Sequence, residues 1–298
     1  MLTTVRGKIM LRMLICCIAL LLPFSGIARN AELPSAIVDA QWLARNLGAA
    51  NLVVVDTRLA EDYLFGHIKG AVNIPYSKLF AEGYLIPGIK EIREIVATAG
   101  INNTSRVVIY DNGDFIWAAR AFWLLQTFGV EKVALLDVGF GNWPKAQVPE
   151  SDQPPQVKRG NFVPRMDSRR LETKLGTRMA IDSKTRTIID GRSVAEYRGE
   201  ESKAKRFGHI PGALHYAWSD NFTQASGGNR LRPLSEMAPI YAGLPRDKDY
   251  VLYCNGGAQS ALNYVMMQAL GYKASVYDGS WFEWGNDSET PVARPTAR

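Results

Sequence analysis

The chain has 298 residues, of which 47% are hydrophobic and 21% charged, and it carries 35 Lys and Arg against 29 Asp and Glu. This length allows two domains with well-buried cores, and the ordinary Gly and Pro contents exclude collagen-like and wholly disordered chains. The cations are dispersed among acidic residues without a long basic run. We therefore expect no nucleic-acid partner.

Residues 1–28 have the pattern of a secretory signal peptide. Three cations in the first twelve residues precede an apolar run from Met13 to Ser25, and small residues follow it. An uncleaved anchor is the alternative, but a membrane span needs about 20 apolar residues, and Pro23 interrupts this shorter run. We expect cleavage, no stable membrane insertion afterwards, and a periplasmic or secreted protein.

The rest of the sequence repeats itself once. The recurring blocks are a β-branched run ending in Asp-x-Arg (53–58 and 187–192), Gly-His-Ile-x-Gly-Ala (66–71 and 208–213), an apolar run (107–110 and 250–253), a Gln-to-Gly segment (126–129 and 268–271) and an Asp-to-Trp segment (137–143 and 278–284). The offset between copies is 134 residues in the first block and 141 to 143 in the others. This pattern indicates a duplicated domain with an insertion in the second copy around 198–207.

Proline and polar residues between the copies predict a linker at 146–159, which leaves one domain at 29–145 and another at 160–298. The runs 107–110 and 250–253 are continuously apolar, as in strands buried on both faces. Helices are predicted over 118–128 and 260–270, each followed by a glycine. These strand-helix-strand units predict an α/β fold with a mostly parallel central sheet, flanked by helices, in each copy.

Cys254 is the only cysteine outside the signal segment. It follows an apolar strand and precedes a Gly-rich loop and a helix, so we expect it at the carboxyl edge of a sheet, where ligands bind. Consecutive glycines let backbone N–H groups point to one centre, and a helix start adds partial positive charge. Such a cradle favours a thiolate and an oxyanionic substrate. The alternative interpretation is a buried structural cysteine.

The first copy has Asp111 at the position of Cys254. A carboxylate at the centre of the cradle would itself occupy the N–H groups. We therefore predict that the first copy is inactive and that it supports the second.

The repeated blocks and the loop from Cys254 to Ser260 resemble the rhodanese-like sulfurtransferases, of the type with an inactive first and an active second domain. The resemblance extends over essentially all of the chain after the signal segment. It implies two tandem rhodanese-like domains. It also implies that Cys254 takes a sulfur from thiosulfate or 3-mercaptopyruvate as a persulfide, and passes it to a thiophilic acceptor such as cyanide or a thiol.

The same resemblance assigns roles to other residues. Arg192, held by Asp190, is expected to contact the donor anion. No cofactor or metal is implied. The backbone amides expected to hold the persulfide belong to Asn255, Gly256, Gly257, Ala258, Gln259 and Ser260.

Departures from the family patterns bear on the donor. Asn255 and Gly256 are neutral where thiosulfate enzymes carry basic residues, and Glu196 stands where mercaptopyruvate enzymes have a second arginine. The loop also lacks the Cys-Gly-Ser-Gly start of the mercaptopyruvate type, which leaves thiosulfate marginally favoured.

Two other functions are alternatives. One is a non-catalytic sulfur- or thiol-binding module for a partner protein. The other is a cysteine phosphatase, which is disfavoured because neither Ser260 nor Ala261 supplies the arginine that such a loop needs to hold phosphate.

Overall fold

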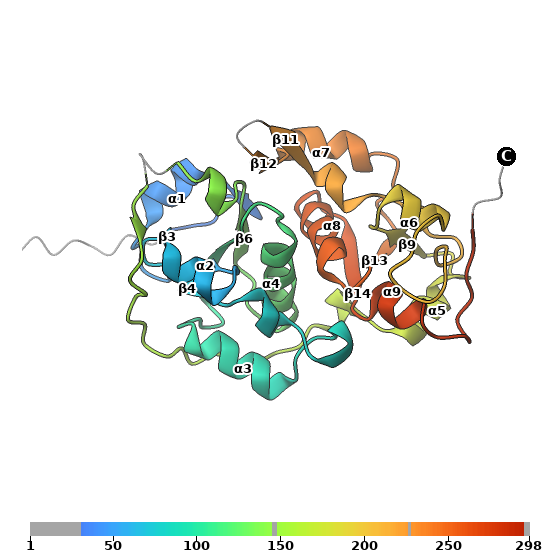
Figure 1. The fold of residues 1–298 in the computed structure, drawn as a ribbon, viewed down its shortest axis with the longest axis horizontal. Helices are drawn as coiled ribbons and strands as arrows, with labels where there is room; N and C mark the ends of the chain where they lie inside the picture. The colour runs from blue at the N-terminus through green and yellow to red at the C-terminus, as the bar shows by residue number, and fades with distance from the viewer. Residues whose placement is uncertain (1–30, 145–147, 226–227, 295–298) are drawn as a thin grey trace, which may run out of the picture.

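The computed structural model describes residues 31–144, 148–225 and 228–294. The predicted signal segment lies outside these residues, so its assignment stays a prediction. None of the helices in the described part of the chain has the length and hydropathy of a bilayer-spanning segment. Figure 1 shows two α/β halves side by side, the first in blue to green and the second in yellow to red.

The first half is built on a parallel sheet in the order β1-β6-β5-β2-β4. Its strands are β1 (Ile37–Val38), β2 (Leu52–Asp56), β4 (Val72–Asn73), β5 (Arg106–Tyr110) and β6 (Val133–Leu136), and its helices are α1 (Ala40–Asn46), α2 (Ala60–Phe65), α3 (Ile89–Thr98) and α4 (Ile116–Thr127). Alternate residues of β5 pack toward opposite faces, because successive side chains of a strand point in opposite directions. Val108 joins the core beside α1, whereas Val107 joins the core beside α3 and α4.

The second half repeats this plan in the order β10-β9-β13-β14-β8, again all parallel. Its strands are β8 (Leu171–Glu172), β9 (Arg186–Asp190), β10 (Leu214–His215), β13 (Asp249–Tyr253) and β14 (Lys273–Tyr277), and its helices are α5 (Lys174–Ala180), α6 (Val194–Arg198), α7 (Leu234–Tyr241), α8 (Ala258–Ala269) and α9 (Ser280–Trp284). The equivalent strands hold equivalent places in both sheets. The predicted α/β fold with two parallel sheets is therefore confirmed.

Two short antiparallel pairs complete the fold. β3 (His67–Ile68) pairs with β7 (Glu150–Ser151), and β11 (Phe222–Ala225) pairs with β12 (Gly228–Leu231). Because β7 falls within the predicted linker, this part of the linker pairs with the first half as a strand. The hairpin of the second half also contacts the first, since Arg230 forms an ion pair with Asp137 at 2.7 Å.

The predicted insertion leaves the repeated contacts intact. His67 stacks on Tyr63 four residues before it, and His209 stacks on Tyr197 twelve residues before it. The extra residues form the segment 199–207, which follows α6. This segment contributes one residue, Lys203, to the pocket that contains Cys254.

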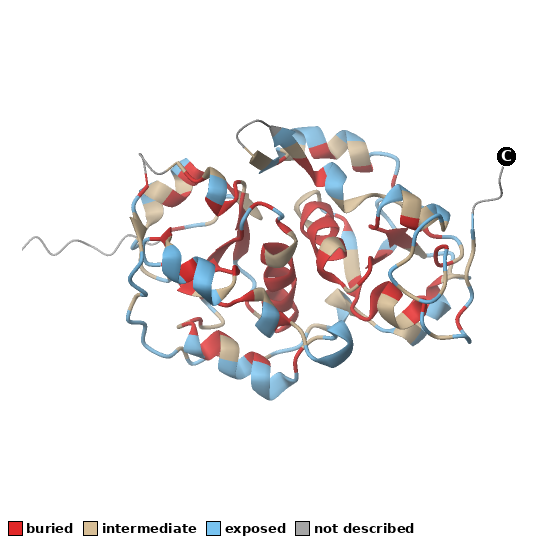
Figure 2. Ribbon diagram, viewed as in Figure 1, coloured by how far each residue is buried: buried red, intermediate tan, exposed pale blue. Residues whose placement is uncertain are grey.

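The two halves meet through α4 and α8, which lie side by side at the centre of Figure 1 and are mostly buried in Figure 2. The rings of Phe122 and Tyr264 are 6.5 Å apart, and Gln268 donates a hydrogen bond to Gln126 at 2.7 Å. One apolar core thus continues from the first half into the second. This contact lets residues of the first half reach the loop that follows β13.

Candidate active site

Cys254 follows β13, the central strand of the second sheet, and opens the loop that leads into α8. The residue is only 1% exposed. Its Sγ accepts a hydrogen bond from the backbone N–H of Gly257 at 3.1 Å and one from the hydroxyl of Ser260 at 3.5 Å. Because the first N–H groups of a helix lack intrahelical acceptors, the start of α8 favours negative charge at this sulfur.

Both loop glycines are closely packed, and Gly257 also needs a backbone conformation that favours glycine. Gly257 has a φ of +81°, and a Cβ there would lie 2.6 Å from Nη1 of Arg120 in the first half. A Cβ at Gly256 would lie 3.1 Å from the ring of Phe282 and 3.3 Å from the Cβ of Tyr84. The shape of the loop therefore depends on contacts with both halves of the molecule.

The start of α9 holds the loop from another side. Trp281 and Phe282 donate their backbone N–H groups to the carbonyls of Cys254 and Asn255, both at 2.9 Å. The hydroxyl of Ser280 accepts the backbone N–H of Cys254 at 3.2 Å and donates to a carbonyl of β14 at 2.7 Å. Ser280 has a φ of +48°, a region few non-glycine residues adopt. These bonds fix the backbone on both sides of the sulfur.

The matching loop of the first half is closed by its own carboxylate. Asp111 Oδ1 accepts the backbone N–H groups of Gly113 at 2.8 Å and Phe115 at 3.0 Å, and its Oδ2 accepts that of Ala118 at 3.2 Å. These are the N–H groups that would otherwise face a ligand. The cradle of the first half is therefore filled, as expected from the sequence.

This filled cradle predicts a pH effect on stability. Burial raises the pKa of Asp111 from 3.8 to about 6, against the opposing effect of the three N–H groups. Because the carboxyl group binds its proton more tightly in the folded protein, it contributes its full stabilisation at pH values below its pKa in the unfolded chain. This stabilisation is lost as the pH rises through its pKa in the folded protein. Relative to Asp111→Asn, the wild-type free energy of unfolding should fall by about 3 kcal/mol between about pH 3 and pH 7. Urea unfolding across this range measures the difference, and parallel profiles would contradict it.

Arg192 forms a buried ion pair in the structure. The residue is fully buried, and its Nη2 pairs with Asp190 Oδ2 at 2.6 Å and donates to the carbonyl of Gly208 at 2.8 Å. Arg58 and Asp56 form the same pair in the first half, also at 2.6 Å. Asp190 does hold Arg192, as expected. The contact between Arg192 and a donor stays a prediction. The structure shows that the Asp-x-Arg pattern forms a buried ion pair in both copies and that Nη1 of Arg192 has no hydrogen-bond partner among the described residues.

Cys254 opens into a pocket of about 680 Å³ between the two halves, a size suited to a small molecule. Its wall is aromatic, since Tyr76 stacks on Trp117 with ring centres 4.3 Å apart and Tyr84 contacts Phe282 at 4.7 Å. The first half contributes Tyr76, Ser77, Phe80, Ala81, Gly83, Tyr84, Ile116 and Trp117, and the second contributes Lys203, Cys254, Asn255, Gly256, Ala258, Gln259 and Phe282. The pocket therefore needs both halves.

Arg120 on α4 crosses from the first half to the back of the loop. It is fully buried, and its Nη1 pairs with Asp278 Oδ1 at 2.7 Å. Asp278 Oδ2 also accepts the backbone N–H of Ile86 at 2.6 Å, so one carboxylate joins α4 to the segment that lines the pocket. Burial lowers the pKa of Arg120, while the charges of Asp278 and Cys254 oppose that shift. The guanidinium thus lies against Gly257, whose backbone N–H bonds the sulfur.

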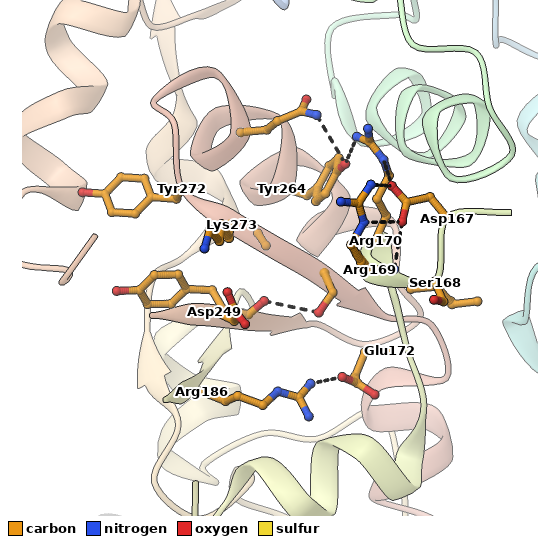
Figure 3. A pocket seen from close by; sticks show the side chains of 15 residues that line it. Asp167, Ser168, Arg169, Arg170, Glu172, Arg186, Asp249, Tyr264, Tyr272 and Lys273 are labelled. Carbon is orange, nitrogen blue, oxygen red and sulfur yellow. Dashed lines mark hydrogen bonds and ion pairs between the residues drawn. The ribbon is translucent and has the colours of Figure 1, made fainter. Parts of the chain in front are cut away.

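A second cavity, of about 600 Å³, lies at the opposite edge of the second sheet (Figure 3). Its lining includes the first residues of β13 and β14, whereas Cys254 follows the last residue of β13. The arginines there are paired: Arg170 bonds Asp167 and Arg186 bonds Glu172. Because ligands bind at the carboxyl ends of parallel strands, we place the active site at Cys254.

Comparison with known proteins decides the family. The family model described as a rhodanese-like domain matches residues 39–146 and 175–287, one match on each half. The chain belongs to the rhodanese-like family. It is 29% identical to the 3-mercaptopyruvate sulfurtransferase of Escherichia coli strain K12, over 86% of this chain and 96% of that protein. It is 33% identical to the thiosulfate sulfurtransferase of Azotobacter vinelandii, over 88% and 98%.

Solved structures agree with this rhodanese-like assignment. A 3-mercaptopyruvate sulfotransferase from Escherichia coli is 26% identical with a TM-score of 0.72, covering 83% of this chain and 99% of that one. EanB in complex with hercynine is 25% identical with a TM-score of 0.77, covering 88% and 70%. The protein is a sulfurtransferase with two tandem rhodanese-like domains.

The structure also shows which parts of this rhodanese-like site the sequence did not predict. Of the six residues whose backbone amides were expected to hold the persulfide, Gly257 bonds the sulfur through its N–H and Ser260 through its hydroxyl, while the roles of the other four stay predictions. The aromatic wall, Arg120 and Lys203 were missed. Two features of the sequence could have drawn attention to the second half: the insertion that carries Lys203 and the repeated block that carries Asp278. No feature of the sequence indicated that residues of the first half would line the site.

Proposed function

We propose that the protein moves a sulfane sulfur from a small donor to a thiophilic acceptor through a persulfide on Cys254. The observation that carries the proposal is the position of the Cys254 Sγ, which is hydrogen-bonded at a helix start and opens into a pocket between the domains. The names of the relatives, a 3-mercaptopyruvate and a thiosulfate sulfurtransferase, support these two compounds as donors.

In the first half-reaction the thiolate of Cys254 attacks the outer sulfur of the donor. A new S–S bond forms while the donor's own bond to that sulfur breaks. The leaving group keeps the electron pair and departs as sulfite from thiosulfate, or as the enolate of pyruvate, which then takes a proton, from 3-mercaptopyruvate.

The persulfide carries negative charge on its outer sulfur, which the N–H groups at the start of α8 are placed to accept. In the second half-reaction cyanide or a thiolate attacks this outer sulfur. The S–S bond to Cys254 breaks and the thiolate is restored. The same cradle thus serves both halves of a ping-pong reaction.

Steady-state thiocyanate formation from cyanide tests this function with thiosulfate and with 3-mercaptopyruvate. Parallel double-reciprocal lines are expected, because donor and acceptor react in separate steps. If neither donor yields thiocyanate above the enzyme-free rate, the transfer reaction is wrong and the binding-module alternative gains. Aryl phosphate hydrolysis that depends on Cys254 would instead favour the phosphatase, for which the loop offers no arginine.

We also propose that the protein acts after export, in the periplasm or outside the cell. The support is the basic start and apolar run within residues 1–28. Protein purified from its natural source should begin after residue 28. A mass that includes this segment would contradict export by cleavage.

A further inference from the structure

The pocket in front of Cys254 is poor in charge. Among the described residues that line it, Lys203 is the one with a positively charged side chain. Of the two nearby arginines, Arg192 pairs with Asp190 and Arg120 with Asp278, and neither lines the pocket. A donor entering this pocket therefore meets a single positive side chain.

Lys203 belongs to the insertion of the second copy, and the backbone around it is held in place. Ser202 accepts a hydrogen bond from the indole N–H of Trp281 at 3.2 Å and donates one to the carbonyl of Arg206 at 2.6 Å. The backbone N–H of Lys205 donates to Asn286 at 2.9 Å. The Lys203 ammonium itself pairs with no carboxylate among the described residues. The backbone beside this residue is therefore held, while the Lys203 side chain is exposed at the pocket.

The other sides of the pocket do not suit a doubly charged anion. The loop side chains that line the pocket are neutral, and behind Asn255 lies the buried carboxylate of Glu196, which accepts its side-chain N–H at 2.8 Å. The stacked rings of Tyr76 and Trp117 line the same pocket. A dianion would leave one charge unmatched and would desolvate against aromatic carbon, which costs free energy.

We propose that Lys203 and the aromatic wall select sulfur donors that carry one negative charge and an apolar, preferably aromatic, body. The anionic head pairs with Lys203 and the body packs on Trp117. This inference rests on the proposed function and names the substrate class of the same site. It makes Lys203 a specificity-determining residue supplied by the insertion.

Benzenethiosulfonate is the probe for this class. The thiolate of Cys254 attacks its terminal sulfur, the bond between that sulfur and the sulfonyl sulfur breaks, and benzenesulfinate leaves with the electron pair. One thiolate and one thiosulfonate anion thus give one persulfide anion and one sulfinate anion. Methanethiosulfonate has the same singly charged thiosulfonate group but no aromatic ring. Thiosulfate has no ring and carries two negative charges.

The experiment compares kcat/KM for these three donors with cyanide as acceptor. In the wild type, benzenethiosulfonate should exceed thiosulfate by about tenfold or more, because ring burial adds apolar contact. Lys203→Met should raise KM for both thiosulfonates about fivefold at low salt with little change in kcat, and the effect should shrink as salt is added. Lys203→Arg should restore binding, and Lys205→Met, on the same segment, should behave as the wild type.

Trp117→Leu distinguishes the contribution of the aromatic wall to donor selection from a general loss of folded protein. It should lower the benzenethiosulfonate to methanethiosulfonate ratio about fivefold, whereas a poorly folded protein would lose both activities equally. A wild type that prefers thiosulfate, or a Lys203→Met variant with unchanged KM, would overturn this inference and leave the proposed function standing. A wild type that transfers sulfur from none of the three donors would overturn both.

Discussion

Cys254→Ser should lower sulfur transfer to cyanide by about 10³-fold or more, because a hydroxyl is not ionised at neutral pH and cannot carry the persulfide. The fold should survive, since serine fits the same space and its oxygen can accept the N–H of Gly257 that now bonds the sulfur. Thiocyanate formation measures the loss, and the urea midpoint checks the fold.

Asp111→Asn is the matched control, because Asp111 holds the equivalent place in the first half. This variant should keep sulfur transfer at the wild-type level while altering stability. Substantial activity in Cys254→Ser would refute the nucleophile assignment. Loss of activity in Asp111→Asn would show instead that the first half takes part in the chemistry.

Arg120→Met should lower the free energy of unfolding by about 3–5 kcal/mol, because it leaves the Asp278 carboxylate buried without its counter-charge. Sulfur transfer should fall as well in protein that remains folded. The reason is that Gly257 packs against this guanidinium and Asp278 holds the segment at Ile86 beside the pocket. Urea unfolding and kcat/KM with a saturating acceptor measure the two effects.

Arg58→Met shows whether the activity loss in Arg120→Met comes from the position of Arg120 beside the Cys254 loop or from the lower stability of the fold. Arg58 makes a comparable buried ion pair with Asp56 at 2.6 Å, but it lies in the first half and does not line the Cys254 pocket. It should cost similar stability and leave kcat/KM of the folded protein unchanged. Equal activity loss in both variants would mean that Arg120 acts only through the fold.

The central strands β5 and β13, the helices α4 and α8 and the Cys254 loop were predictable because their signals are local. Continuous apolar runs gave the buried strands, and the comparison of two copies aligned Cys254 with Asp111. The predicted contact of Arg192 with a donor stays a prediction, because the Asp-x-Arg pattern is the same in sequence whether the arginine faces a ligand or pairs with its own aspartate, as it does here. The local pattern does not encode the direction of that side chain.

The surroundings of the sulfur were not predictable for a different reason. Arg120 and Trp117 reach the loop only because α4 docks on α8, and that docking joins residues more than a hundred positions apart. Lys203 was visible as part of an insertion, yet its place in the pocket depends on how Ser202 and Arg206 hold that segment. Such contacts follow from tertiary packing alone.

The most direct test of the central claim is the intact mass of the protein after brief exposure to thiosulfate, and separately to benzenethiosulfonate, followed by cyanide. The account predicts a gain of one sulfur atom that cyanide removes and that is absent from Cys254→Ser. A wild type that gains no sulfur while Cys254 still reacts with an alkylating reagent would contradict it, as would a sulfur adduct that persists in Cys254→Ser.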